Sequence, residues 1–182
     1  MIKDIFVPRV SEVVTQEFLD HVASIYKMDH FGFHGIEHWL RVLFNGRLIA
    51  NAVMANVKVV ELFCLLHDTQ RQNEDFDPEH GLRAAQYAES ARNVWFEVTD
   101  AEMWQLTEAL AHHSSGQTFS HPTVQACWDA DRLDLARVGT RPDPQYLCHS
   151  FSKRPDVIDA AIQRSSLTTR GFNIGATRPD IA

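Results

Sequence analysis

The sequence lacks several features that assign a chain to a common class of protein. It has no apolar run long enough to span a membrane, and its first ten residues, MIKDIFVPRV, lack the apolar segment of a secretory signal. The net charge is −7 and Lys and Arg are scattered, so the basic stripe of a protein that binds a nucleic-acid polymer is missing. These absences predict a cytoplasmic protein that binds neither a membrane nor a nucleic-acid polymer. They leave the oligomeric state open.

A disulfide framework is also missing. The three cysteines, Cys64, Cys127 and Cys148, are odd in number and widely spaced, and two of them lie inside apolar helical patterns. This arrangement predicts buried, reduced thiols rather than disulfides or a zinc knuckle.

Signals for β-structure are absent, whereas signals for helices recur. No pair of alternating apolar runs is joined by Asn-Gly or Asp-Gly, as a hairpin would require. We therefore expect an all-α protein with about seven or eight helices. Its 182 residues suit one domain, over residues 1–164. Residues 165–182 contain two glycines, a proline and no helical period, so we expect an irregular C-terminal tail.

Helix starts are predicted from residues that cap or open a first turn. They are Ser11, Asn56, Asp77-Pro78, Thr99 with Glu102 in a capping box, and the prolines Pro122, Pro144 and Pro155.

The segment ELFCLLHDTQRQNED, residues 61–75, combines an apolar run with two groups that resist burial. Apolar residues surround the helix on all sides, which predicts a helix buried by its neighbours. His67 and Asp68 follow at its C-terminal end, where free backbone carbonyls favour a cation. His38 lies on the apolar face of another predicted helix, with Val42 and Ile49.

The two aspartates of the segment DAD are predicted to face in different directions. Asp131 falls on the stripe of Val124 and Leu135, so it points inward. Asp129 is rotated by about 140° from that stripe and should face outward or sideways. A buried carboxylate is costly unless it is paired, hydrogen-bonded or bound to a cation.

These inward groups lie on separate helices and are of the types that bind a divalent first-row metal ion. Binding to one ion would account for His38, His67, Asp68 and Asp131 together. The alternative is structural, because a single buried histidine is usually a hydrogen-bonded core residue, and a buried aspartate can pair with Arg41 or Arg132.

At these residues the chain resembles the HD-domain superfamily of metal-dependent phosphohydrolases. The family's order of motifs is matched by HGIEHWLRV with His38, LLHDTQR with His67 and Asp68, and WDADRLDLARVG with Asp131. The resemblance covers a helical core over residues 30–140. It extends to an uncharacterised subgroup with DPEHG, here residues 77–81. It implies an HD-domain helical bundle in which these four residues bind the metal.

Further histidines leave the number of metal ions open. Some members of the family bind a second ion through histidines between the His-Asp pair and the last aspartate. His80 and either His112 or His113 occupy that part of the sequence, although His80 could instead only help its helix to start. His113 continues an apolar stripe with Leu106 and Leu110, and His112 lies beside it.

The resemblance implies hydrolysis of a phosphate ester of a nucleotide or similar small metabolite by a metal-activated water. Mn, Co, Ni, Zn, Fe or Mg are conceivable as the ion. Asp68, His112 and His113 are the predicted catalytic residues. Arg71, His80 and His34 are predicted to contact the substrate, although Arg71 could instead face solvent. Two other functions stay open: a non-haem di-iron oxygenase, and a metal- or nucleotide-binding regulatory module without turnover.

Overall fold

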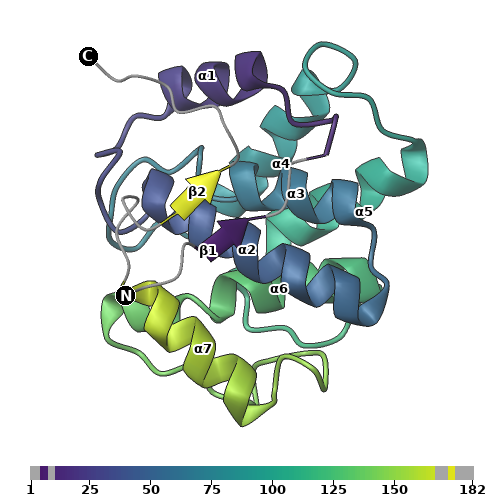
Figure 1. The fold of residues 1–182 in the computed structure, drawn as a ribbon. Coiled ribbons are helices and arrows are strands. Elements are labelled where there is room, and N and C mark those ends of the chain that lie inside the picture. The colour runs from purple at the N-terminus through teal and green to yellow at the C-terminus, as the bar shows by residue number, and fades with distance from the viewer. Residues whose placement is uncertain (1–4, 8–10, 167–171, 175–182) are drawn as a thin grey trace.

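The computed structural model describes residues 5–7, 11–166 and 172–174. In these ranges the chain forms seven α-helices, one 3₁₀ helix and two short strands (Figure 1). The predicted all-α class and the predicted number of helices are confirmed. The elements are β1 (Ile5–Val7), α1 (Gln16–Ile25), α2 (Ile36–Val53), α3 (Val57–Leu66), α4 (His80–Ala91), α5 (Asp100–His112), α6 (Pro122–Arg132), η1 (Leu135–Val138), α7 (Pro155–Ser165) and β2 (Phe172–Ile174).

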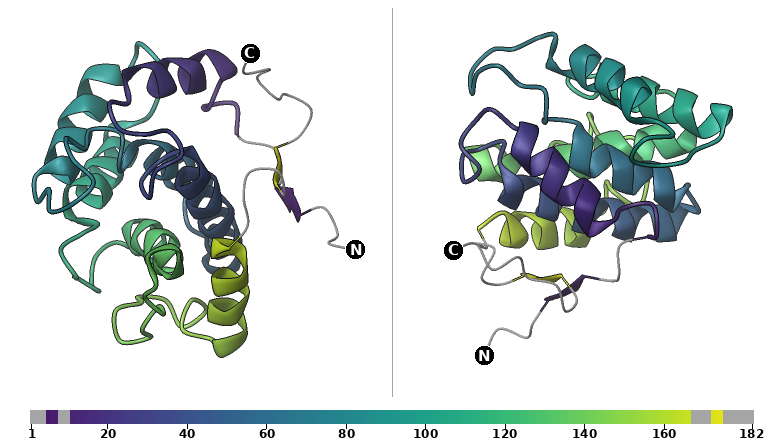
Figure 2. Two further views of the ribbon diagram at one scale, coloured as in Figure 1. Left: turned by 90° about the vertical axis from the view of Figure 1, so that its left-hand side faces the viewer. Right: turned by 90° about the horizontal axis from the view of Figure 1, so that it is seen from above.

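Helix α3 is the centre of the bundle. Every residue from Val59 to Leu66 is buried, as the apolar composition of this segment predicts. Helices α1, α2, α5 and α6 all pack against it. Figures 1 and 2 place α1 at one end of the bundle and α7 at the other, with α2 and α3 between them. The C-terminal end of α3 therefore delivers His67 and Asp68 into the interior.

Four of the predicted helix starts are confirmed. Asn56 accepts a hydrogen bond from the backbone of Val59 at the start of α3, and Thr99 and Glu102 form the predicted capping box of α5. Pro122 and Pro155 each open a helix.

Three predicted starts are wrong. Helix α1 begins at Gln16 after the cap Thr15, rather than at Ser11. Helix α4 begins at His80, because the carboxylate of Asp77 accepts from the backbone of Gln72 and so holds the preceding loop instead of capping the helix. Pro144 lies in a turn.

The strands are an addition to the prediction. β1 and β2 pair in parallel, with Ile5 opposite Phe172 and Val7 opposite Ile174. Each has only three residues, too few for an alternating pattern to be recognised in the sequence. Most of the predicted irregular tail lies outside the described residues.

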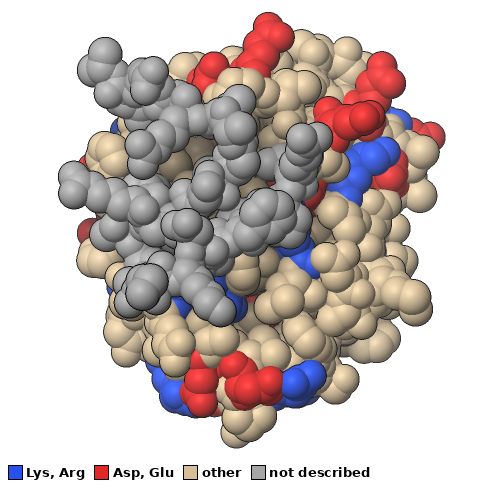
Figure 3. Space-filling view, viewed as in Figure 1, with Lys and Arg blue, Asp and Glu red and all other residues tan. Residues whose placement is uncertain are grey.

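The described surface carries charges of both signs. On the face in Figure 3, acidic and basic side chains lie near one another on the coloured part of the surface. Among the helices in the described ranges, none has the length and apolar character that crossing a bilayer demands. All three cysteines are free, and Cys64 and Cys127 are buried.

Helices α4 and α5 approach closely at Gly81, beside His80. A Cβ atom at Gly81 would overlap the carbonyl oxygen of Leu110 and lie 3.2 Å from Nδ1 of His113. The glycine therefore lets His80 on one helix meet His113 at the end of the other.

We predict that Gly81→Ala destabilises the protein. Overpacking against a backbone carbonyl costs about 1–3 kcal/mol, whereas alanine gains at most about 1 kcal/mol in helix propensity. The melting temperature should fall. The matched control is Ser90→Ala on the exposed face of the same helix, which should change stability by less than about 0.5 kcal/mol. Equal melting temperatures for the two variants would contradict the prediction.

Candidate metal centre

Helices α2 and α6 and the C-terminal end of α3 bring the four predicted metal ligands together. Nε2 of His38 lies 3.0 Å from Nε2 of His67, 3.5 Å from Oδ2 of Asp68 and 3.3 Å from Oδ1 of Asp131. His67 Nε2 lies 3.5 Å from Oδ2 of Asp68 and 3.8 Å from Oδ1 of Asp131. We call these four residues the first cluster.

A second cluster uses the other oxygen of the same aspartate. Oδ1 of Asp68 lies 3.4 Å from Nε2 of His80 and 3.8 Å from Nε2 of His113. The two imidazole nitrogens are 2.8 Å apart. All three side chains are buried. Asp68 thus lies between the two clusters, with one oxygen directed toward each.

The Nδ1 atoms of three histidines are committed to backbone carbonyls. His67 donates to the carbonyl of Cys64 at 3.1 Å, His113 donates to Leu110 at 2.8 Å, and His80 donates to Asp77. A carbonyl oxygen can only accept, so the proton of each neutral ring lies on Nδ1. Each Nε2 therefore carries a lone pair that faces the cluster.

His38 has a different partner, Asp134. Its Nδ1 donates to Oδ2 of Asp134 at 2.8 Å. Asp134 also accepts from Nε of Arg41, at 2.8 Å from Oδ1, and from Oγ of Ser165 at 3.0 Å. A carboxylate that holds a ligating histidine fixes the tautomer and the orientation of its ring.

This arrangement fits divalent metal ions. Two imidazole lone pairs that face each other at 3.0 Å or 2.8 Å repel unless a cation lies between or beside them. Nitrogen ligands bind such ions at about 2.0–2.1 Å, so two adjacent ligands of one ion are roughly 3 Å apart. Both pairs of histidines match this spacing. His38, His67 and Asp68, and likewise Asp68, His80 and His113, form groups whose ligand atoms could hold an ion.

Within each pair of histidines, the pKa of one ring is lowered and the pKa of the other is raised. Burial lowers the pKa of His67 to about 3 and also lowers that of His80. Burial opposes the charged form of His38 as well, but hydrogen bonds to Asp131, Asp134 and Asp68 outweigh it and raise the pKa of His38 to about 9. The pKa of His113 is raised for the same kind of reason, since its contact with Asp68 outweighs burial. Without metal, one proton per pair can therefore take the place of the ion.

The carboxylates stay charged. Burial alone would raise the pKa of Asp68, but the adjacent imidazoles hold it well below its usual range. The pKa of Asp131 is lowered too, mainly because its hydrogen bond with His38 outweighs burial. The side chain of Asp131 is 17% exposed, the most of the first cluster, so the cluster opens toward solvent on this side.

His34 lies at the edge of the first cluster. Its ring meets that of His38 edge-on, with centroids 6.3 Å apart. Nδ1 of His34 donates to Oε2 of Glu74 at 2.7 Å, and its side chain is 15% exposed. Burial lowers the pKa of His34, so the neutral ring directs the lone pair of Nε2 away from Glu74.

Arg71 lies at the second cluster. Its Nη1 is 3.4 Å from Oδ1 of Asp68 and 3.3 Å from Nε2 of His80. Backbone carbonyls of Asn73 and Asp75 accept from its other nitrogens. The side chain is buried, so the alternative of a solvent-facing charge is wrong. Contact with a substrate stays a prediction.

Two sequence-based placements need correction. His112 is 43% exposed and pairs with Glu108 at 3.8 Å, so the structure does not bring it to either cluster; His113, one residue further round the helix, is at the second cluster instead. Asp129 was predicted to face outward or sideways, but it is fully buried. Its carboxylate accepts from the backbone N–H of Cys148 and His149 at 2.6 and 2.9 Å.

Asp134 and Glu74 are site residues that the sequence analysis missed. Asp134 follows Asp131 by three residues, a helical spacing that places the two near one face. That spacing could have identified Asp134. Glu74 lies in the irregular segment QRQNED, where no period relates it to His34, 40 residues away.

We predict that metal affinity rises with pH up to about 9. Below that pH, metal-free His38 keeps a proton that a bound ion must displace. Affinity should therefore change by about tenfold per pH unit for each proton released. Calorimetric titrations with Zn²⁺ or Mn²⁺ at about pH 7, in buffers of different ionisation enthalpy, would count the protons. Equal heats in all buffers, with an affinity that does not depend on pH, would contradict this.

We also predict that Asp134→Asn weakens metal binding by roughly 10–100-fold. Three donors converge on this carboxylate, and an amide turns an N–H₂ group toward one of them. Competition against a chromogenic chelator measures the change. Asp159→Asn, in an exposed ion pair with Arg141, is the control and should bind metal as the wild type does. If both variants bound metal with the affinity of the wild type, Asp134 would have no role in metal binding.

The comparisons with known proteins concern the fold. No protein-family model matches the sequence, and no curated protein matches it either. Among solved structures, the chain is similar to a predicted HD superfamily hydrolase from an uncultured Thermotogales bacterium, with a TM-score of 0.62 and 23% sequence identity. The match covers 81% of this chain and 84% of that chain. The chain therefore has the fold of a predicted HD superfamily hydrolase, the fold that its His-Asp motifs imply.

Proposed function

We propose that this protein is a metal-dependent phosphohydrolase that hydrolyses a phosphate ester of a nucleotide or similar small metabolite. The observation that carries the proposal is the position of Asp68, which directs Oδ2 toward one pair of facing imidazoles and Oδ1 toward another. A carboxylate between two histidine pairs is suited to bridge two ions. Mn, Co, Ni, Zn, Fe and Mg all accept these ligand types.

The chain's residues fit the needs of phosphoryl transfer. His38, His67, Asp68 and Asp131 would hold one ion, and Asp68, His80 and His113 a second. Such ions lower the pKa of bound water and neutralise charge on the phosphoryl group. Asp131 is the more exposed of the two carboxylates in the first cluster and can accept a proton from the attacking water. Arg71 presents a buried guanidinium group that can bind a phosphate oxygen, and His34 can contact the leaving group through Nε2.

The second candidate is a non-haem di-iron oxygenase of the same fold. It requires histidines beyond the first cluster, and His80 and His113 supply them. Iron-dependent visible absorption and oxygen consumption, without release of phosphate, would favour this reaction over hydrolysis.

The decisive experiment is metal analysis of protein purified without chelator, followed by a phosphatase screen against nucleotides and sugar phosphates with several divalent ions. We predict that Asp68→Ala abolishes activity and abolishes metal binding at both clusters, since it removes a predicted ligand from each. His113→Ala should lose about one equivalent of metal and keep the other.

His112→Ala is the matched control for His113→Ala. The two histidines are adjacent on the same helix, but His112 is half-exposed and distant from the clusters. Its metal content and activity should equal those of the wild type, and thermal unfolding should confirm that all variants fold. If Asp68→Ala retained metal and full activity, the proposed function would be wrong.

A further inference from the structure

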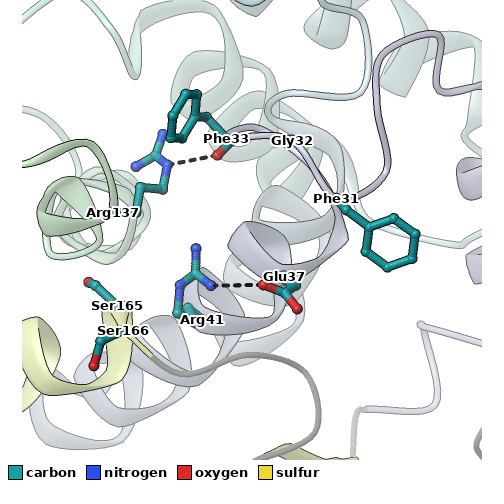
Figure 4. A pocket seen from close by; sticks show the side chains of 8 residues that line it. All are labelled: Phe31, Gly32, Phe33, Glu37, Arg41, Arg137, Ser165 and Ser166. Carbon is teal, nitrogen blue, oxygen red and sulfur yellow. Dashed lines mark hydrogen bonds and ion pairs between the residues drawn. The ribbon is translucent and has the colours of Figure 1, made fainter.

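A cavity next to the metal centre is not used by any step described so far. It has a volume of about 310 Å³, in the lower range for small-molecule sites. Figure 4 shows its lining, which comes from the loop before α2, from α2, from η1 and from the end of α7. The lining residues are Phe31, Gly32, Phe33, Glu37, Arg41, Arg137, Ser165 and Ser166.

Two arginines give the cavity its chemistry. The guanidinium groups of Arg41 and Arg137 approach the same space from different elements (Figure 4). Their side chains are only 7% and 9% exposed, so both are fixed in place. Arg137 donates through Nε to the carbonyl of Phe33 at 2.9 Å and through Nη1 to that of Asp134 at 3.2 Å. These backbone carbonyls orient Arg137, and its Nε also lies 4.0 Å from Oδ2 of Asp134, so the carboxylate partly balances its charge.

The carboxylates nearby restrict where an anion can bind. Asp134 pairs with Arg41 from the interior, and Glu37 lies 3.9 Å from Arg41 at the wall of the cavity. An anion is repelled near Glu37, so it is favoured on the side of Arg137 and Phe33. The ring of Phe33 is 60% exposed and lies beside Arg137 in Figure 4, where it offers an apolar face to the rest of a ligand.

The cavity adjoins the metal centre along the chain and through Asp134. Glu37 directly precedes the ligand His38, and Phe33 directly precedes His34. Nε of Arg41 donates to both oxygens of Asp134, at 2.8 Å to Oδ1 and 3.1 Å to Oδ2, and Oδ2 also accepts from His38. Asp134 therefore links the wall of the cavity to Nδ1 of His38, whose Nε2 faces the first cluster.

We propose that this cavity binds a second phosphate group of the substrate, one that is not cleaved, with Arg137 as its main contact. Guanidinium groups bind phosphate through paired, charge-assisted hydrogen bonds, and Arg137 presents a largely buried guanidinium group at the wall of the cavity. The substrate is then a metabolite with two separated phosphate groups or a chain of phosphates. This inference rests on the proposed function, because it assigns the cavity to the substrate of that reaction. Binding of phosphate in the cavity does not itself require metal.

The test measures binding of inorganic phosphate and pyrophosphate to metal-free protein by calorimetry. Wild-type protein should bind, and Arg137→Gln should bind roughly tenfold more weakly or worse, because a charge-assisted contact is lost. Arg141→Gln is the matched control, since Arg141 is 63% exposed and pairs with Asp159 away from the cavity. It should bind as the wild type does.

A second variant, Glu37→Gln, should change the affinity for phosphate in the opposite direction. Glu37→Gln removes the negative charge at the wall, so phosphate should bind several-fold more tightly. This result stays informative even if Arg137→Gln folds poorly, which thermal unfolding would reveal. No phosphate binding to metal-free wild type, or equal binding by wild type, Arg137→Gln and Glu37→Gln, would overturn the proposal. Because the assay contains no metal, failure of the phosphohydrolase proposal would leave its outcome unchanged.

With the metal-loaded protein, the ratio of kcat/KM for a bisphosphate to that for phenyl phosphate provides a second readout. Arg137→Gln should lower this ratio, whereas Arg141→Gln should not. An unchanged ratio in Arg137→Gln would contradict a role for the cavity in substrate choice.

Discussion

The structure depends on one electrostatic constraint, which is that four imidazole Nε2 atoms face each other in two buried pairs. At 3.0 and 2.8 Å, each pair requires a cation or a proton. Asp68 lies between the pairs with its charge intact, so the interior attracts positive charge from two sides. Burial of the apolar residues of α3 stabilises the helix in the centre of the bundle. This burial fixes the position of His67 and Asp68 at its C-terminal end, where the two pairs of imidazoles meet.

The positions of the cluster histidines on their helices explain how their tautomers are fixed. His67 and His113 are the C-caps of α3 and α5, and each donates Nδ1–H to the carbonyl three residues earlier. The last carbonyls of a helix have no partner within the helix, so they are free to accept. His38 lies in the first turn of α2, where the nearby carbonyls belong to the helical ladder, so it requires a side-chain acceptor. Asp134, 96 residues away, supplies that acceptor.

The difference between local contacts and contacts with distant segments separates what the sequence could predict from what it could not. Local periods were sufficient for the inward faces of His38, Asp131 and His113, and capping residues for the starts of α3 and α5. The sequence analysis left His112 and His113 both open, although the helical period favours His113, which continues the buried stripe of Leu106 and Leu110. Pairings between distant segments were not predictable, because nothing in a local pattern relates His38 to Asp134 or His34 to Glu74. The same limit applies to Asp129, whose burial depends on backbone N–H groups about twenty residues further along the chain.

Asp134 shows why the metal centre and the adjoining cavity should be considered as one site. Its two oxygens accept from three donors on two elements: His38 and Arg41 of α2, and Ser165 at the end of α7. An anion that drew Arg41 toward the cavity would weaken the ion pair between Arg41 and Asp134, and a more basic Asp134 would strengthen its hydrogen bond to His38. An imidazole with a stronger acceptor at Nδ1 is a better electron donor at Nε2. If the cavity binds an anion and the clusters bind metal, as proposed, the two events would be coupled through this buried carboxylate, and each would favour the other.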